Sequence, residues 1–166
     1  MEVLLAEKAG FCFGVKRAVD EAVRLREKYN KPIHTLGPLI HNNDVVTSLT
    51  EKGICPISLE EAYNLAPGEV VVIRSHGVGK NIIERLLAIG VIIENGTCPY
   101  VKNIQQKVEE YYNKGYNIII VGDESHPEVI GINGWCNDSA IISKDGSNIE
   151  AIPRKVCVVS QTTEKQ

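Results

Sequence analysis

Residues 70–76 read Val70-Val71-Val72-Ile73-Arg74-Ser75-His76, four apolar residues followed by three polar ones. Such an unbroken β-branched run is typical of a strand that is buried on both faces of a parallel sheet. In open α/β sheets, ligands bind beyond the carboxyl ends of the strands. This stretch therefore predicts an α/β fold and indicates the sheet edge at which functional residues are expected.

The rest of the chain alternates between short apolar runs and amphipathic stretches. Strands are expected at residues 3–6, 33–36, 91–93, 118–121, 140–142 and 156–159, and helices at residues 15–29, 44–51, 80–88, 101–113 and 128–134. In the first of these helices, apolar residues recur at helical spacing and charged residues occupy the other face. The alternation implies mostly parallel sheets with helices on both faces, an α/β architecture.

The composition restricts the classes of function. The chain has 166 residues, of which 43% are hydrophobic and 23% are charged, and its formal net charge is -3. The apolar content is ample for a buried core and excludes a disordered chain. An acidic balance without a basic stripe argues against a nucleic-acid partner. No apolar run approaches the roughly 18 residues of a membrane span, and the first residues lack the basic region of a signal peptide. We therefore expect a cytoplasmic protein that binds neither membranes nor nucleic acids.

A weak internal repeat has a period of 86 residues. Cys12 and Cys98 each lie in a glycine-containing loop that leads from a strand into a helix, and residues 70–76 match residues 156–162 at the same offset. Each unit contains a cysteine, a helix, a strand, a loop with a histidine, a second helix and a strand that ends in polar residues. The sequence thus predicts two equivalent modules, at residues 9–94 and 95–166.

Five cysteines are present, and none forms the C-x-x-C pair of zinc ribbons or thioredoxin-like proteins. An odd number in a chain expected to be cytoplasmic favours free thiols, metal binding or catalysis over disulfides. Cys12 and Cys98 open helices, where the helix dipole favours the thiolate and hence metal ligation or nucleophilic attack. Cys55 in a connector, Cys136 in a turn and Cys157 in a strand are interpreted as structural.

Three of the four histidines, His41, His76 and His126, follow predicted strands. Because the carboxyl ends of parallel strands meet at one edge, we expect these side chains to converge there with the two loop cysteines. Histidines near helix N-termini bind anions together with backbone N–H groups, and no glycine-rich phosphate-binding motif is present. These features predict a phosphate pocket. His34, inside a strand, is interpreted as structural.

Two further polar positions belong to the same edge. Glu128 lies two residues after His126, where a buried carboxyl group can transfer protons. Thr162 is the counterpart of His76 in the repeat, and Thr163 follows it. A hydroxyl in such a loop is usually a cap, so the functional interpretation of Thr162 depends on the repeat.

The residues alone leave two functions open. One is an anion-binding α/β module without a metal cluster, which holds a phosphorylated metabolite through His41 and His76. The other is a thiol enzyme with Cys12 as the nucleophile and a histidine as the base. The duplicate cysteine at position 98 argues against the thiol enzyme.

Six segments, in order over essentially the whole chain, resemble the 4-hydroxy-3-methylbut-2-enyl diphosphate reductases, the last enzymes of the non-mevalonate isoprenoid pathway. The segments are Gly10-Phe11-Cys12-Phe13-Gly14-Val15, Leu36-Gly37-Pro38-Leu39-Ile40-His41-Asn42, Arg74-Ser75-His76-Gly77-Val78, Thr97-Cys98-Pro99, Gly122 with His126-Pro127-Glu128, and Ser160-Gln161-Thr162-Thr163. Any one of them is a weak signal, whereas six with matching order make coincidence very improbable.

The resemblance implies a trefoil of three α/β modules around one [4Fe-4S] cluster, with one cysteine ligand from each module. Cys12 and Cys98 match two of these metal ligands, and no other cysteine of the chain has the context of the third. Residues 1–8 then form a strand that belongs with the missing third module. The chain is expected to be two of the three modules, an incomplete and inactive piece of the enzyme.

The resemblance also implies roles for the loop residues. His41 and His76 match ligands of the substrate diphosphate, and His126, Thr162 and Thr163 also match substrate-binding positions. Glu128, with His126 and Thr162, matches the catalytic group that orients the substrate hydroxyl and relays protons. The implied reaction is a reductive dehydroxylation that gives isopentenyl and dimethylallyl diphosphate, with electrons from a low-potential donor such as ferredoxin or flavodoxin.

Overall fold

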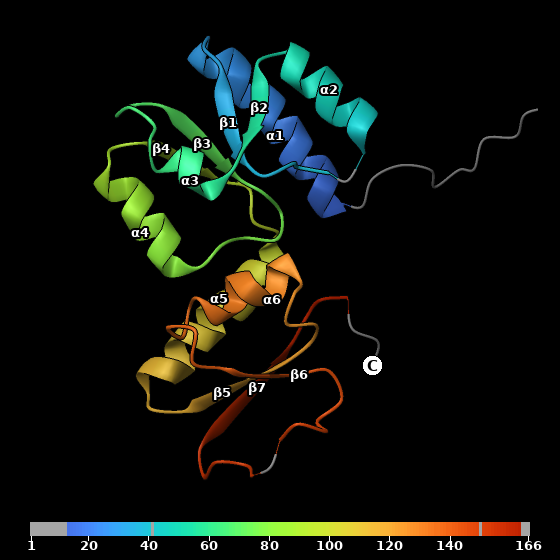
Figure 1. Ribbon diagram of the computed structural model, residues 1–166, viewed down its shortest axis with the longest axis vertical. Coiled ribbons are helices and arrows are strands. Elements are labelled where there is room, and N and C mark those ends of the chain that lie inside the picture. The colour runs from blue at the N-terminus through green and yellow to red at the C-terminus, as the bar shows by residue number, and fades with distance from the viewer. Residues whose placement is uncertain (1–12, 41, 150, 164–166) are drawn as a thin grey trace, which may run out of the picture.

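The computed structural model describes residues 13–40, 42–149 and 151–163, which form two parallel sheets with their helices (Figure 1). In chain order the elements are α1 (Phe13–Tyr29), β1 (Ile33–Leu36), α2 (Asn43–Glu51), β2 (Ile54–Ile57), α3 (Leu59–Ala62), β3 (Val70–Ile73), α4 (Lys80–Ala88), β4 (Ile92–Asn95), α5 (Pro99–Asn113), β5 (Asn117–Val121), α6 (Pro127–Asn133), β6 (Ile141–Ser143) and β7 (Val156–Ser160). The strand predicted at residues 3–6 lies outside the described residues. The α/β fold with parallel sheets is confirmed.

The N-terminal half, α1 to β4, is a three-layer structure. Its strands are parallel in the order β2-β1-β3-β4. On β3, Val70 and Val72 pack in one cluster with α1 and α2, whereas Val71 and Ile73 pack in a second cluster with α3 and α4. Successive side chains of a strand point to opposite faces, so helices on both faces bury all four residues of β3.

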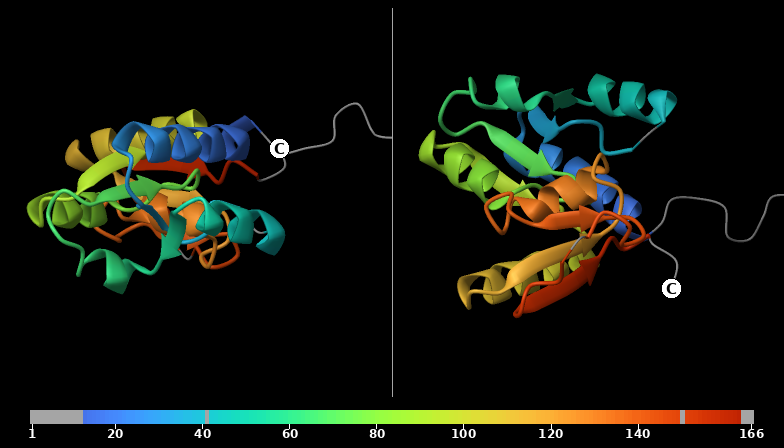
Figure 2. Two further views of the ribbon diagram at one scale, coloured as in Figure 1. Left: turned by 90° about the horizontal axis from the view of Figure 1, so that it is seen from above. Right: turned by 60° about the horizontal axis from the view of Figure 1, so that its bottom comes forward.

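The C-terminal half, α5 to β7, has a parallel sheet in the order β6-β5-β7. Both α5 and α6 pack on the face that carries Ile118 and Ile120. On the other face Val158, the register partner of Ile119, is 58% exposed. Figure 2, right, turns these strands toward the viewer. Within the described residues, the expectation of helices on both faces is therefore wrong for this sheet, because its two helices share one face.

The internal repeat is visible in the topology. The order β2-β1-β3 of the first sheet matches the order β6-β5-β7 of the second, and β3 and β7 begin 86 residues apart. In each half the long helix comes first and leads into the central strand of the three. The pseudo-repeated modules predicted from the sequence are confirmed at the level of strand order.

Most predicted elements agree with the structure to within two residues, but β2 and α3 were not predicted. Cys55, interpreted as part of a connector, lies on β2 opposite His34. Pro56 in this run obscures the strand because proline donates no ladder hydrogen bond, and β2 accommodates it as an edge strand. After β2, the side chains of Ser58 and Glu61 form a reciprocal capping box that starts the short helix α3.

The two halves meet at the loop between β3 and α4. The indole Nε1 of Trp135 donates a hydrogen bond to the carbonyl oxygen of Val78 at 3.0 Å, and the ammonium of Lys80 lies 2.6 Å from a carboxylate oxygen of Glu109. A Cβ added at Gly131 of α6 would lie 3.3 Å from the backbone of Gly77, so the glycine permits this close approach. No helix in the described part of the chain is long and apolar enough to cross a membrane.

Candidate functional site

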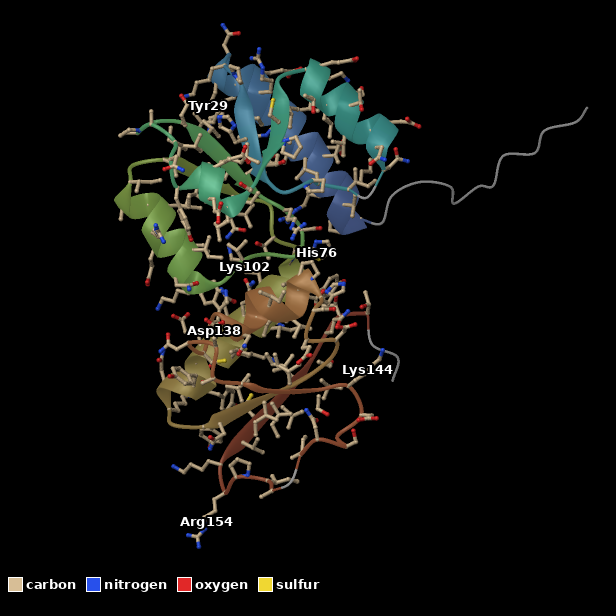
Figure 3. All side chains as sticks on the ribbon, viewed as in Figure 1. Tyr29, His76, Lys102, Asp138, Lys144 and Arg154 are labelled. Atoms are coloured by element: carbon tan, nitrogen blue, oxygen red, sulfur yellow. The ribbon has the colours of Figure 1, made fainter. Side chains whose placement is uncertain are left out.

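Most of the described site residues lie in loops that follow the carboxyl ends of strands, and Glu128 lies in the first turn of α6. His76 follows β3, Cys98 lies between β4 and α5, His126 lies between β5 and α6, and Thr162 follows β7. Figure 3 shows His76 where the two halves meet. Two further predicted residues, Cys12 and His41, lie outside the described residues.

Glu128 and Thr162 form the most direct contact of the site. The backbone N–H of Thr162 donates to Oε1 of Glu128 at 2.6 Å, and the Thr162 hydroxyl donates to Oε2 at 2.7 Å. Glu128 is 2% exposed, whereas Thr162 is exposed. A buried carboxylate is costly unless hydrogen bonds satisfy it, and Thr162 provides one donor for each oxygen. The hydroxyl thereby connects the buried carboxyl group to the surface of the site.

His126 is oriented by the first turn of α6. It is the N-cap residue, and its Nδ1 accepts a hydrogen bond from the backbone N–H of Glu128 at 3.1 Å. An accepting Nδ1 places the proton of the neutral ring on Nε2, which is then a donor. The ring meets His76 edge to face, with the ring centroids 5.6 Å apart. Two histidines from different halves are thus in contact, but their strands, β3 and β5, belong to different sheets and not to the single sheet edge expected from the sequence.

Gln161 belongs to the site although it was not predicted. It is 6% exposed, its Oε1 accepts from the backbone N–H of Asp123 at 3.2 Å, and its Nε2 donates to the Thr163 hydroxyl at 2.7 Å. The amide therefore ties the loop after β7 to the loop after β5 and fixes Thr163. The 86-residue repeat provided the signal, because Gln161 is the counterpart of Ser75, another buried polar residue after a strand.

Cys98 has the features of a thiolate ligand. It is a free, partly buried cysteine and the N-cap residue of the 15-residue helix α5, with Pro99 in the first turn. The position meets the positive end of the helix dipole. Among the described residues, no three histidine, cysteine or acidic side chains gather as a metal site. The predicted partner ligand Cys12 lies outside that part of the chain.

The loop that carries Cys98 is held against β3. The backbone N–H of Gly96 donates to the carbonyl oxygen of Ile73 at 2.9 Å. A Cβ added at Gly96 would lie 2.5 Å from that same oxygen, so only glycine allows the approach. The guanidinium of Arg17 in α1 donates to the carbonyl oxygen of Thr97 at 3.0 Å. Neither Gly96 nor Arg17 was assigned a role from the sequence.

The other cysteines have different surroundings. Cys136 is fully buried, and its thiol donates to the carbonyl oxygen of Asn133. Burial raises the pKa of the Cys136 thiol and also that of Cys157 on β7. A raised pKa favours the neutral thiol, which is a poor metal ligand and nucleophile. These surroundings agree with the structural interpretation of both residues.

A groove of about 310 Å³ lies between the N-terminal half and α6. Apolar side chains such as Ile82 and Ile130 line it together with Arg74, and burial lowers the pKa of the Arg74 guanidinium. None of the described site residues lines this groove. The candidate site is instead the hydrogen-bonded cluster of strand-end residues described above.

Comparisons with known proteins agree on one family. The family model described as LytB protein matches residues 3–166. The 4-hydroxy-3-methylbut-2-enyl diphosphate reductase of Clostridium perfringens is 62% identical over 164 residues, covering 99% of the chain and 58% of the relative. That of Clostridium acetobutylicum is 58% identical, covering 99% of the chain and 26% of the relative.

Two solved structures are similar. One is (E)-4-hydroxy-3-methyl-but-2-enyl diphosphate reductase, the terminal enzyme of the non-mevalonate pathway, with a TM-score of 0.79 and 36% identity over 99% of the chain and 59% of its own. The other is the E-1-hydroxy-2-methyl-but-2-enyl-4-diphosphate reductase from Plasmodium falciparum, with a TM-score of 0.83 and 28% identity over 95% of the chain and 50% of its own. The chain thus spans less than two thirds of the length of these relatives.

Proposed function

The chain belongs to the LytB protein family, and on this premise we propose that it is part of a 4-hydroxy-3-methylbut-2-enyl diphosphate reductase. The observation that carries the proposal is the Glu128–Thr162 pair next to the His126–His76 contact. It joins a buried carboxyl group, an exposed hydroxyl and two imidazoles where the two halves meet. A reductase that removes a hydroxyl group from a diphosphate ester needs such a proton donor beside an anion site.

The reaction that we propose is a two-electron reductive dehydroxylation. The carbon–oxygen bond of the allylic alcohol breaks, and the hydroxyl group takes one proton and leaves as water. Two electrons and a second proton convert the allylic fragment to isopentenyl or dimethylallyl diphosphate. A thiolate-held [4Fe-4S] cluster supplies the electrons at low potential when it is bound. Cys12 and Cys98 are its ligands from this chain, and the third ligand lies outside it.

Glu128 holds the proton that the leaving hydroxyl group needs. In its protonated form the Glu128 carboxyl passes this proton to Oγ1 of Thr162, and the Thr162 hydroxyl passes its own proton to the substrate hydroxyl. The short hydrogen bond between the two side chains supports this route. Burial of Glu128 keeps bulk water from this part of the route.

His76 and His126 bind the polar part of the substrate in this proposal. Nε2 of His126 is a donor because Nδ1 is engaged by the Glu128 backbone. His41 contributes a further diphosphate contact, and Thr163 is held for the same purpose by Gln161. Binding energy from the diphosphate then positions the reacting hydroxyl group.

We also propose that the chain is two modules, residues 9–94 and 95–166, of a three-module trefoil in which residues 1–8 belong with the third module. The length of the relatives and the exposed side chain of Val158 support this division. The isolated chain is then inactive because it lacks one cluster ligand. The complete enzyme works in the cytoplasm with a low-potential donor such as ferredoxin or flavodoxin.

The test is anaerobic reconstitution of the full-length protein with iron and sulfide, followed by EPR spectroscopy and turnover with a chemical reductant. We expect C98S to lose the cluster and the activity, and the matched control C157S to retain both. A colourless wild-type protein that binds inorganic diphosphate equally well with and without Cys98 would instead establish the cluster-free anion-binding module.

A further inference from the structure

The peptide bond between Thr97 and Cys98 is held at both of its polar ends by the N-terminal half. Its carbonyl oxygen accepts a hydrogen bond from Nη2 of Arg17 at 3.0 Å. Its N–H donates to the carbonyl oxygen of Ser75 at 2.9 Å. Arg17 comes from α1, 80 residues earlier in the chain, and Ser75 is the neighbour of His76.

This double contact fixes the direction in which the Cys98 side chain leaves the backbone. The plane of the preceding peptide and the φ angle of Cys98, -54°, together determine the Cα–Cβ direction. Rotation of that plane would break both hydrogen bonds. Thr97 is also 2% exposed, and its own N–H donates to Oδ1 of Asn95 at 3.0 Å, so the segment before Cys98 has few alternatives.

The contact differs from an ordinary surface arginine interaction. Among the described residues, none of the ion pairs includes Arg17, although this side chain lies on the exposed part of α1. Arg24, about two helical turns further along α1, instead forms an ordinary ion pair with Glu21 on the same helix. A charged donor that reaches a backbone carbonyl on another element forms a charge-assisted hydrogen bond, which is stronger than a neutral one.

We propose that Arg17 is a positioning residue for the thiolate of Cys98. Arg17 holds the Thr97–Cys98 peptide and so fixes the position of the Cys98 sulfur relative to α1. This helix begins at the residue after Cys12, the other proposed ligand from this chain. This inference rests on the proposed function, because it takes Cys98 to be a cluster ligand. It adds a residue of the N-terminal half that controls the geometry of a ligand in the C-terminal half.

The test compares R17Q, R17K and the control R24Q in the full-length, anaerobically reconstituted protein. The readouts are the EPR spectrum of the cluster and the rate at which a strong chelator removes its iron. R17Q lacks the charged donor, and we expect an altered EPR spectrum and iron loss about 10-fold faster than in wild type. R17K retains a charged donor, so we expect smaller changes in the EPR spectrum and in the rate of iron loss than in R17Q. R24Q should match wild type.

The results separate this inference from the proposed function. If C98S keeps its cluster, the ligand assignment and the inference fail together. If C98S loses its cluster but R17Q matches wild type in spectrum and iron release, only the role of Arg17 is overturned. If R17Q does not fold, R17K decides by the same two readouts. Failure of both variants to fold, with R24Q folded, would show that Arg17 serves the fold and would overturn the inference.

Discussion

The two oxygens of the Glu128 carboxylate each accept a hydrogen bond from one residue, Thr162, which lies 34 positions later in the chain. One donor is the backbone N–H and the other is the side-chain hydroxyl. The backbone contact holds the carboxylate in place whatever side chain occupies position 162. Of the two contacts, only the one through the hydroxyl group can pass a proton from the carboxyl group to the substrate. Substitutions at position 162 therefore separate the positioning of Glu128 from proton transfer.

We expect T162V to lower kcat of the full-length protein in the proposed reaction far more than T162S does. Valine removes the hydroxyl but leaves the backbone N–H on Oε1, whereas serine keeps both donors. Loss of a positioned proton-transfer group typically costs about 10²–10⁴-fold in rate. Valine also leaves Oε2 without its donor, which lowers the free energy of unfolding by about 1–3 kcal/mol. Steady-state kinetics and thermal unfolding measure the two effects, and equal kcat for both variants would contradict the relay.

Replacement of Glu128 by glutamine tests the carboxyl group itself. The amide oxygen can accept from the Thr162 backbone, and the Thr162 hydroxyl can rotate to accept from the amide nitrogen. The fold and substrate binding should therefore persist while kcat falls by about 10²–10⁴-fold. Isothermal titration with substrate and single-turnover kinetics give these two quantities. A variant that binds normally and turns over at the wild-type rate would exclude Glu128 as the proton donor.

The two nitrogens of His126 have separable roles. Asparagine at this position offers Oδ1 where Nδ1 of the histidine accepts from Glu128 N–H, and it is a favoured N-cap residue. The shorter asparagine side chain does not reach the position that Nε2 of the histidine occupies. We expect H126N to keep the stability of the wild type and to raise KM about 10-fold, the loss of one hydrogen bond to a charged ligand. H126A, which loses both contacts, should in addition unfold at a lower temperature.

The strand runs of the sequence locate most of the fold because they are unbroken and β-branched. The runs at β1 and β3 end at the residues predicted, Leu36 and Ile73. The strand β2 was missed because Pro56 interrupts its hydrogen-bonding pattern. The repeat contained the missing information, since residues 54–57 shifted by 86 fall on 140–143, which include the strand predicted at residues 140–142.

The candidate site likewise contains contacts that the sequence predicts and contacts that it does not. The grouping of His126 and Thr162 follows from the rule that parallel strands of one sheet end at the same edge, because β5 and β7 are neighbours. His76 follows β3 of the other sheet, so its contact with His126 depends on how the two halves pack. The contact of Arg17 with Thr97 does not follow from any such rule. Its acceptor is a backbone carbonyl, which every residue has, and only the packing of α1 beside the Cys98 loop brings the two together.

Gly96 provides a steric test of the loop before Cys98. A methyl group at this position would lie 2.5 Å from the carbonyl oxygen of Ile73, which is backbone and cannot move aside without shifting β3. We expect G96A to displace the loop, to cost about 1–3 kcal/mol of stability and to lower the cluster content of the reconstituted protein. The matched control is G115A, at an exposed glycine with open space around it. G115A strains only its own positive φ and should keep the full cluster content.

Cys136 predicts how stability depends on alkaline pH. Burial raises the pKa of this thiol in the folded protein above its ordinary value of 9.0. The stability that the neutral thiol contributes is fully present below the pKa of the unfolded chain and is lost as the pH rises through the folded pKa. Between these two values the loss approaches about 1.4 kcal/mol per pH unit for one proton.

Serine at position 136 keeps the donor to Asn133 and does not ionise in this range. Unfolding midpoints of wild type and C136S, measured under reducing, anaerobic conditions from pH 7 to above 9, should therefore diverge only on the alkaline side, with the wild type falling more steeply. Parallel curves would show that the Cys136 thiol ionises as readily in the folded protein as in the unfolded chain.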